Sequence, residues 1–103
     1  MDYQVILSPS ARTDLRDIVR YISFDAPDRA VRFGQFLASR TKVLGQFPEL
    51  GRVVPEVGDT SIREIIVRSY RVVYRLNHGR HSVEVLRFWH AARGTPENSI
   101  DEL

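Results

Sequence analysis

The chain has 103 residues, close to the commonest size of a single domain, so we expect one hydrophobic core. It contains no cysteine, which excludes disulfides, thiolate metal sites and cysteine nucleophiles. The formal net charge is +2, and no apolar run approaches the about 20 residues that span a bilayer, so the sequence favours a cytoplasmic protein that does not contact a membrane.

The N-terminal part of the chain predicts a short strand followed by a helix. Residues 3–7 (YQVIL) are apolar and β-branched enough for a strand. Ser8 and Pro9 then have the side chains preferred at the N-cap and at the first position of a helix. Apolar residues recur with helical spacing and form one stripe, made of Ala11, Leu15, Ile18, Val19 and Ile22. This pattern predicts a helix that ends near residues 25–27.

A second helix is predicted to start at Pro27 and to run for about twenty residues. Its apolar positions form one broad face, made of Ala30, Phe33, Leu37, Leu44 and Phe47. Gly34 lies in the middle, where glycine costs about 1 kcal/mol relative to alanine, so either the first helix approaches closely there or the glycine is merely tolerated. The short connection predicts that the two helices pack as an antiparallel hairpin.

Proline and glycine residues mark a loop over residues 48–59, and loops of this length in compact domains are often functional. Three strands follow, at residues 62–68, 71–76 and 82–89.

The last two strands are predicted to form a hairpin around residues 77–80. A two-residue loop there would place Tyr74 opposite Val83 and Val72 opposite Val85. The face toward the helices would then carry Val72, Tyr74, Leu76, Val83 and Val85. The other face would carry Arg71, Val73, Arg75, Ser82, Glu84 and Leu86.

The order strand, two helices, three strands predicts a two-layer α+β fold, with the helical hairpin packed on a mainly antiparallel four-stranded sheet. We expect residues 1–95 to form the single domain and residues 96–103, which include Glu97, Asp101 and Glu102, to form an acidic tail.

Positive charge is concentrated in the predicted strands. Residues 61–95 hold seven arginines and only two acidic residues, Glu64 and Glu84. The arginines are Arg63, Arg68, Arg71, Arg75, Arg80, Arg87 and Arg93. A preference for arginine codons in a GC-rich genome would explain the shortage of lysine but not the clustering. We therefore expect these guanidinium groups to share one exposed surface that binds phosphates or an acidic peptide, although each could instead pair locally, as Arg75 could with Glu84.

Most catalytic templates are absent, and we expect no cofactor and no metal. His78, His81 and His90 have no carboxylate partner at metal-binding spacing. His90 could act as an acid, a base or a phosphate ligand, or could cap the end of its strand. For Phe88 and Trp89, base stacking is one possibility, and packing of one of them under the helices is the other.

Several segments together resemble toxins of the RelE/ParE superfamily from bacterial type II toxin-antitoxin systems. They are SPSA at residues 8–11, LGQFPELG at 44–51, REI at 63–65, SYRVVYR at 69–75 and VEVLRFWHAAR at 83–93. The resemblance covers nearly the whole chain and implies the same α+β fold. It also implies a growth inhibitor that a cognate antitoxin neutralises in a toxin-antitoxin hetero-oligomer, through a disordered, often acidic antitoxin tail that folds around the toxin.

The resemblance implies two alternative targets. RelE-like members cleave messenger RNA on the ribosome, and such a nuclease would use Arg63, Arg71, His90 and Arg93 here. ParE-like members inhibit DNA gyrase without that catalytic set. In this chain Ile65 replaces a second cation, and no tyrosine follows Tyr74, so we favour the ParE-like alternative, with no catalytic residue. A module that binds a partner without toxicity is the third alternative.

Under the favoured alternative, a set of basic residues is expected to contact the target or the antitoxin. The set is Arg63, Arg68, Arg71, Arg75, Arg87, His90 and Arg93.

Overall fold

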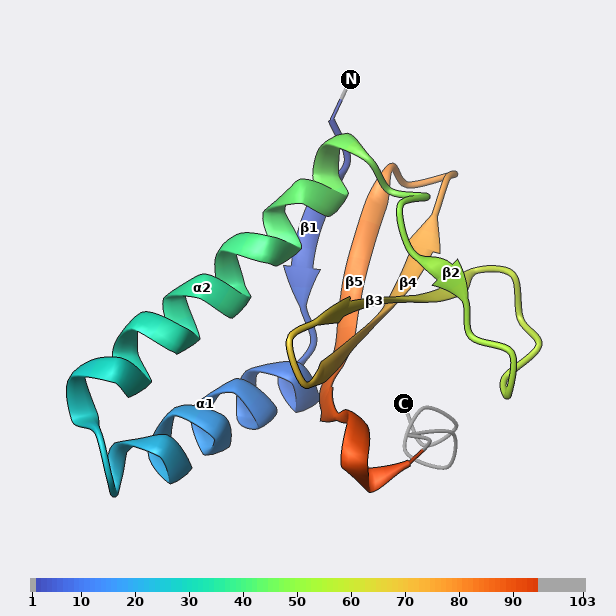
Figure 1. Ribbon diagram of the computed structural model, residues 1–103. Coiled ribbons are helices and arrows are strands. Elements are labelled where there is room, and N and C mark those ends of the chain that lie inside the picture. Colours follow the sequence, from blue (N-terminus) through green and yellow to red (C-terminus); the bar gives the residue numbers. More distant parts are fainter. Residues whose placement is uncertain (1, 95–103) are drawn as a thin grey trace.

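Two helices lie against one side of a five-stranded sheet in the computed structural model, which describes residues 2–94 (Figure 1). The elements are β1 (Gln4–Leu7), α1 (Pro9–Ser23), α2 (Pro27–Gln46), β2 (Arg52–Val53), β3 (Ile62–Val67), β4 (Tyr70–Asn77), β5 (Ser82–His90) and a short 3-10 helix, η1 (Ala91–Arg93). The strand order is β1-β5-β4-β3-β2, and only β1 and β5 pair in parallel. The predicted two-layer α+β architecture is confirmed.

The sequence signals at the helix starts are confirmed. The Ser8 hydroxyl accepts a hydrogen bond from the Ala11 amide at 3.0 Å and donates one to the Leu86 carbonyl at 3.0 Å, so this cap also ties α1 to β5. Gly34 does mark a close approach of the helices. A Cβ atom at Gly34 would lie 2.6 Å from Cγ2 of Val19, which leaves no room for a side chain.

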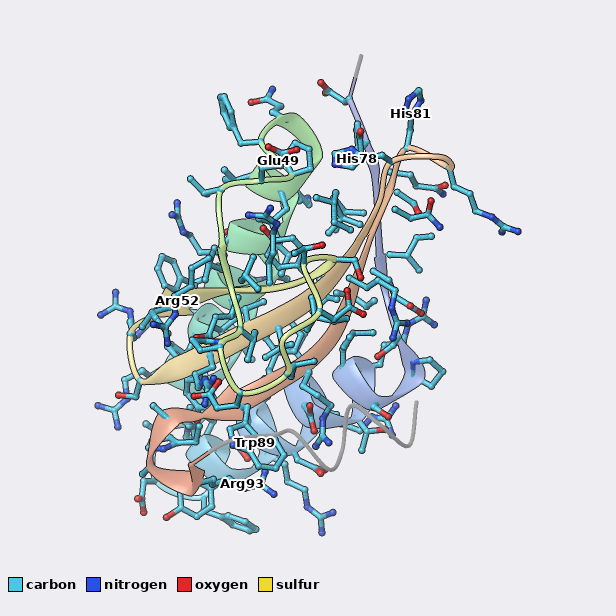
Figure 2. The ribbon with its side chains drawn as sticks, turned by 90° about the vertical axis from the view of Figure 1, so that its right-hand side faces the viewer. Glu49, Arg52, His78, His81, Trp89 and Arg93 are labelled. Carbon is cyan, nitrogen blue, oxygen red and sulfur yellow. The ribbon has the colours of Figure 1, made fainter. Side chains whose placement is uncertain are left out.

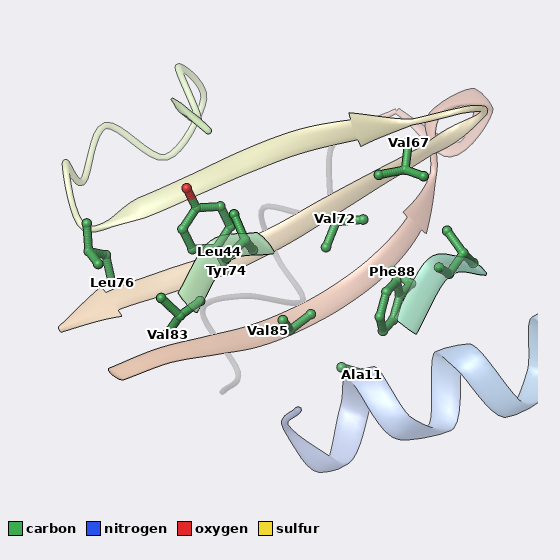
Figure 3. Close-up of a cluster of buried hydrophobic side chains, with 10 residues drawn as sticks. Ala11, Leu44, Val67, Val72, Tyr74, Leu76, Val83, Val85 and Phe88 are labelled. Carbon is green, nitrogen blue, oxygen red and sulfur yellow. The ribbon is translucent and has the colours of Figure 1, made fainter. Parts of the chain in front are cut away.

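The main core fills the space between the helices and the sheet (Figure 3). The five sheet residues predicted for this face are all buried there: Val72, Tyr74, Leu76, Val83 and Val85. Leu37 and Leu44 of α2 meet them from the helix layer. The prediction for Phe47 is wrong, because α2 ends before this residue and its side chain is 58% exposed.

The predicted register of the β4–β5 hairpin is also wrong. Its connection spans four residues, 78–81, rather than two, so Tyr74 lies opposite Val85 and Leu76 opposite Val83. The shift is two residues, which preserves the side-chain faces. A β-bulge between Val73 and Tyr74 then inserts Leu86 as an extra residue, and this reverses the alternation in the remainder of β5.

The sheet has five strands instead of the four predicted, because the long loop before β3 contains β2. The same loop folds over the side of the sheet that faces away from the helices, which we call the outer face. Val54 and Val57 pack there on Val73 and Leu86. The outer face is therefore partly covered.

The proposed acidic tail, residues 96–103, lies outside the described residues. Within residues 2–94, no helix has the length and hydropathy needed to cross a membrane.

Candidate functional site: an aromatic and basic groove

The seven arginines of the strands do not share one exposed surface, so that expectation is wrong. Residues directly opposite each other on neighbouring strands point to the same face. Arg63 lies opposite Tyr74, whose side chain is in the main core, whereas Arg71 lies opposite Trp89 and contacts Glu64 on the outer face. Two of the proposed nuclease residues are thus on opposite faces of the sheet.

Arg71 is held by hydrogen bonds from each of its three guanidinium nitrogens. Its Nε donates to Glu64 at 2.6 Å, its Nη1 donates to the Gly94 carbonyl at 3.0 Å, and its Nη2 lies 3.4 Å from Glu56. The Glu64 side chain is 0% exposed and also accepts from Arg52 at 2.8 and 2.7 Å. Burial acts to lower the pKa of Arg71, but the hydrogen bonds and charges of Glu64 and Glu56 outweigh it and raise this pKa. Every branch of the guanidinium therefore has a partner within the protein.

Two further arginines form ion pairs within the protein. Arg87 makes a bidentate pair with Asp14 of α1, at 2.7 and 2.9 Å, and Asp14 also accepts from the Phe88 amide. Arg75 pairs with Glu84 at 3.5 Å, as the local-pairing alternative predicted. These contacts join strands and a helix, so they explain part of the arginine content without a ligand.

The bulge decides which of the two neighbouring aromatic residues enters the core. Phe88 is buried among the helix-facing residues, whereas Trp89 lies on the outer face and donates to the Gly94 carbonyl at 3.1 Å. The Arg93 guanidinium stacks on the Trp89 ring, with Cζ 3.8 Å from the ring centre. Figure 2 shows Trp89 and Arg93 at the end of the molecule opposite to the hairpin histidines His78 and His81.

His90 lies on the helix side, at the end of β5. Its Nδ1 accepts a hydrogen bond from the Ala92 amide at 3.1 Å, so it caps η1, and its ring meets Tyr70 edge-on at 5.1 Å. Burial raises the pKa of Tyr70, with a smaller contribution from Tyr21.

Tyr70 and His90 lie in the middle of a groove that crosses this end of the molecule. The groove consists of three adjoining hollows of about 560, 270 and 480 Å³. The first and second share Tyr70 and His90, and the second and third share Arg29 and Phe33. We call this feature the end groove. Its walls come from α1, α2, the β3–β4 turn and the end of β5, so no single segment defines it.

The first end of the end groove, which we call the α1 end, is lined by Asp14, Asp17, Ile18, Tyr21 and Arg93. The other end, the α2 end, is lined by Arg29, Arg32, Phe33, Phe36 and Arg68.

The end groove exposes aromatic surface beside unpaired cations. Tyr21 is 77% exposed, and Arg68 lies over the Phe36 ring at 4.8 Å. In the part of the chain that the structure describes, Arg29, Arg32 and Arg68 form no ion pair. Flat apolar rings next to uncompensated guanidinium groups are typical of surfaces that bind another macromolecule.

Three of the predicted contact residues line the end groove: Arg68, His90 and Arg93. The sequence reasoning missed the helical side, above all Tyr21, Arg29 and Arg32. The helical spacing of Asp14, Ile18, Tyr21 and Ile22 was a usable signal, because it places these residues along one line of α1.

Among residues 2–94, no group of three or more His, Cys, Asp and Glu side chains is arranged to hold a metal ion.

Comparison with known proteins points to one family. The model of a family described as ParE toxin of the type II toxin-antitoxin system parDE matches residues 5–94. No curated protein matches the chain by sequence.

Solved structures of toxins share the fold. A chain of the chromosomal ParDE system from P. aeruginosa is 18% identical with a TM-score of 0.72, over 85% of this chain and 95% of that chain. A chain of the RelBE2 toxin-antitoxin complex from Mycobacterium tuberculosis is 20% identical with a TM-score of 0.67, over 89% and 94%. A free mutant of the E. coli toxin RelE is 17% identical with a TM-score of 0.69, over 100% and 99%.

Proposed function

The chain belongs to the ParE toxin family of type II toxin-antitoxin systems, and from this membership we propose that it inhibits growth by binding DNA gyrase, without catalysing a reaction itself. A cognate antitoxin, the kind of partner present in the complexes of structurally similar toxins, neutralises it.

The state of Arg71 supports an inhibitor over a ribosome-dependent nuclease. A nuclease of this kind needs a guanidinium that can bind the phosphate as negative charge develops on it. The Arg71 side chain is only 9% exposed, and Glu64, Glu56 and Gly94 occupy its donors. A phosphate would have to displace a fully buried carboxylate to reach it, which is costly because two buried charges would lose their partner.

The remaining nuclease candidates do not compensate for Arg71. Arg63 faces the helix layer and donates to the Gly51 carbonyl at 3.0 Å. His90 caps η1 from the groove side, and Arg93 stacks on Trp89. Arg63 lies on the face of the sheet opposite to Arg71, and the Arg93 guanidinium is engaged with the Trp89 ring, so neither supplies the phosphate-binding cation that Arg71 would have to provide.

We assign the end groove to the antitoxin. Its aromatic residues offer apolar area to a segment that folds on binding, and its unpaired arginines suit a segment with acidic side chains.

The test of the gyrase proposal is a supercoiling assay with purified gyrase, relaxed plasmid and this protein in molar excess. We expect loss of supercoiling and accumulation of linear DNA after detergent and protease treatment, because an inhibitor of this kind traps the cleaved complex. The same protein bound to an antitoxin-derived segment is the matched control and should leave gyrase active.

Full supercoiling in the presence of the free protein would refute the gyrase proposal. Primer extension on translated transcripts then tests the alternative: codon-phased cuts that disappear in Arg71→Ala would establish a nuclease. If expression does not slow growth, and if neither gyrase inhibition nor messenger RNA cleavage is detected, the third alternative applies: a module that binds a partner without toxicity.

A further inference from the structure

The two ends of the end groove differ in charge. Arg29, Arg32 and Arg68 give the α2 end three positive charges, and none of the residues 2–94 that line this end is acidic. At the α1 end, Asp14 and Asp17 accompany Arg93, and Asp14 is already paired with Arg87. Charge therefore falls from strongly positive to about neutral along one continuous apolar surface.

Arg68 adds an independent observation. Its φ angle is 54°, in the left-handed region where glycine, asparagine or aspartate is preferred in a two-residue hairpin loop. A residue with a Cβ atom is strained in this conformation, and such strain is concentrated at functional positions. The guanidinium lies over Phe36 and lines the α2 end, so the strained residue supplies a cation to the groove.

We infer that the end groove binds its occupant in one direction only, with acidic side chains at the α2 end, apolar side chains over Tyr70 and a basic or uncharged part at Asp17. This inference rests on the proposed antitoxin site and specifies how the segment is oriented. Charges at the rim of an interface act mainly on encounter rate and register, so the arginines select the direction while the aromatic rings supply most of the contact area.

A suitable probe is a synthetic amphipathic helix of about 18 residues, or roughly 27 Å. Its apolar stripe is flanked by glutamates at one end and lysines at the other, and a nitroxide label is attached to either end. The chain has a mass of 11.9 kDa, so its amide signals can be resolved by nuclear magnetic resonance. We expect the label at the acidic end to broaden the amides of Arg29 and Arg32, and the label at the basic end to broaden those of Asp17 and Ala92. The same peptide with the two charged ends exchanged should bind with its chain direction reversed.

Charge reversal in the protein tests whether the arginines of the α2 end cause the preferred direction of binding. Arg29→Glu/Arg32→Glu should weaken binding of the probe about tenfold at low salt, mostly through slower association. Arg12→Glu/Arg16→Glu is the matched control, because these exposed arginines of α1 do not line the end groove. Arg68→Gly should weaken binding without lowering the free energy of unfolding, because glycine relieves the left-handed strain.

The outcomes distinguish the inferred binding direction from the proposed antitoxin site. The inference is supported if the peptide broadens the expected amide signals and if Arg29→Glu/Arg32→Glu binds it more weakly than the control variant does. Binding in both directions, or equal effects of the two double variants, overturns the inference and leaves the proposed antitoxin site intact. No binding of the peptide, or competition by a single-stranded oligonucleotide for the same amides, overturns both.

Discussion

Glu64 is the residue whose replacement should destabilise the protein most clearly. Its carboxylate is 0% exposed and accepts from Arg71 at 2.6 Å and from Arg52 at 2.8 and 2.7 Å. In Glu64→Gln the amide presents a donor to one arginine, and Arg71 retains a buried charge without a full counter-charge. Removing one partner of a buried pair costs about 3–5 kcal/mol. The free energy of unfolding of a natural domain is only roughly 5–15 kcal/mol, so the variant should lose a large fraction of its stability.

Urea unfolding followed by Trp89 fluorescence measures this loss, because the chain has a single tryptophan. Glu84→Gln is the matched control: its pair with Arg75 is 3.5 Å long and about 40% exposed on both sides, so the change should cost less than about 1 kcal/mol. The double variant Arg71→Met/Glu64→Leu should regain most of the stability, because two apolar side chains replace the buried pair.

Equal unfolding free energies for Glu64→Gln and Glu84→Gln would show that the buried Glu64–Arg71 pair contributes no more stability than the exposed Glu84–Arg75 pair. If Glu64→Gln does not fold, the double variant still provides the test, because a buried unpaired charge predicts that Arg71→Met/Glu64→Leu is more stable than Glu64→Gln. The result also bears on the proposed function, in which this buried pair keeps Arg71 from binding a phosphate.

Two further predictions concern the contacts that β3 and β4 make with residues 48–51, just before β2. Gly51→Ala should lower the free energy of unfolding by about 1–3 kcal/mol, because a Cβ atom there would lie 2.6 Å from the Glu64 carbonyl oxygen. Gly79→Ala is the control and should change it by less than about 0.5 kcal/mol, since the nearest atom to its Cβ would be 3.4 Å away. Similar losses for the two variants in urea unfolding would contradict this explanation. Tyr74→Phe should cost about 1–3 kcal/mol near neutral pH, because the Pro48 carbonyl and the Gly51 amide lose their hydrogen-bond partner. Burial raises the pKa of Tyr74 against a smaller opposing effect of the Gly51 hydrogen bond, so its stabilising contribution is complete below the unfolded pKa of about 10 and is lost as the pH rises through the folded pKa. The unfolding free energy of Tyr74→Phe should therefore fall less steeply above about pH 10 than that of the unchanged protein, and equal slopes would argue against this assignment.

Features that depend on neighbours in the chain could be read from the sequence. Ser8 and Pro9 set the start of α1, Pro27 set the start of α2, and the spacing of apolar residues identified the face of β4 that packs against the helices. Gly34 pointed to the close approach of the helices. These features follow from backbone sterics, caps and side-chain periodicity, all of which act over a few residues.

Features that depend on strand pairing could not be read in the same way. The extra residue Leu86 reverses the alternation of β5, which sends Phe88 into the core and Trp89 to the outer face. A bulge leaves no periodic signal of its own, because it is defined by the partner strand. The two-residue strand β2 was missed for a related reason: only its pairing with β3 makes it a strand.

The sequence alone showed the arginine-rich composition of the last three strands, the order of the elements other than β2 and η1, and the face of the sheet that packs against the helices. Tertiary structure decided what each arginine does. Arg87 pairs with Asp14, which is 73 positions away in the chain, and Arg71 meets Glu56 only because the intervening loop folds over the sheet. A guanidinium in a folded protein pairs with a carboxylate or stays exposed, depending on which groups the packing brings near it. That proximity depends on how the helix layer, the sheet and the loops assemble, and not on any local sequence pattern.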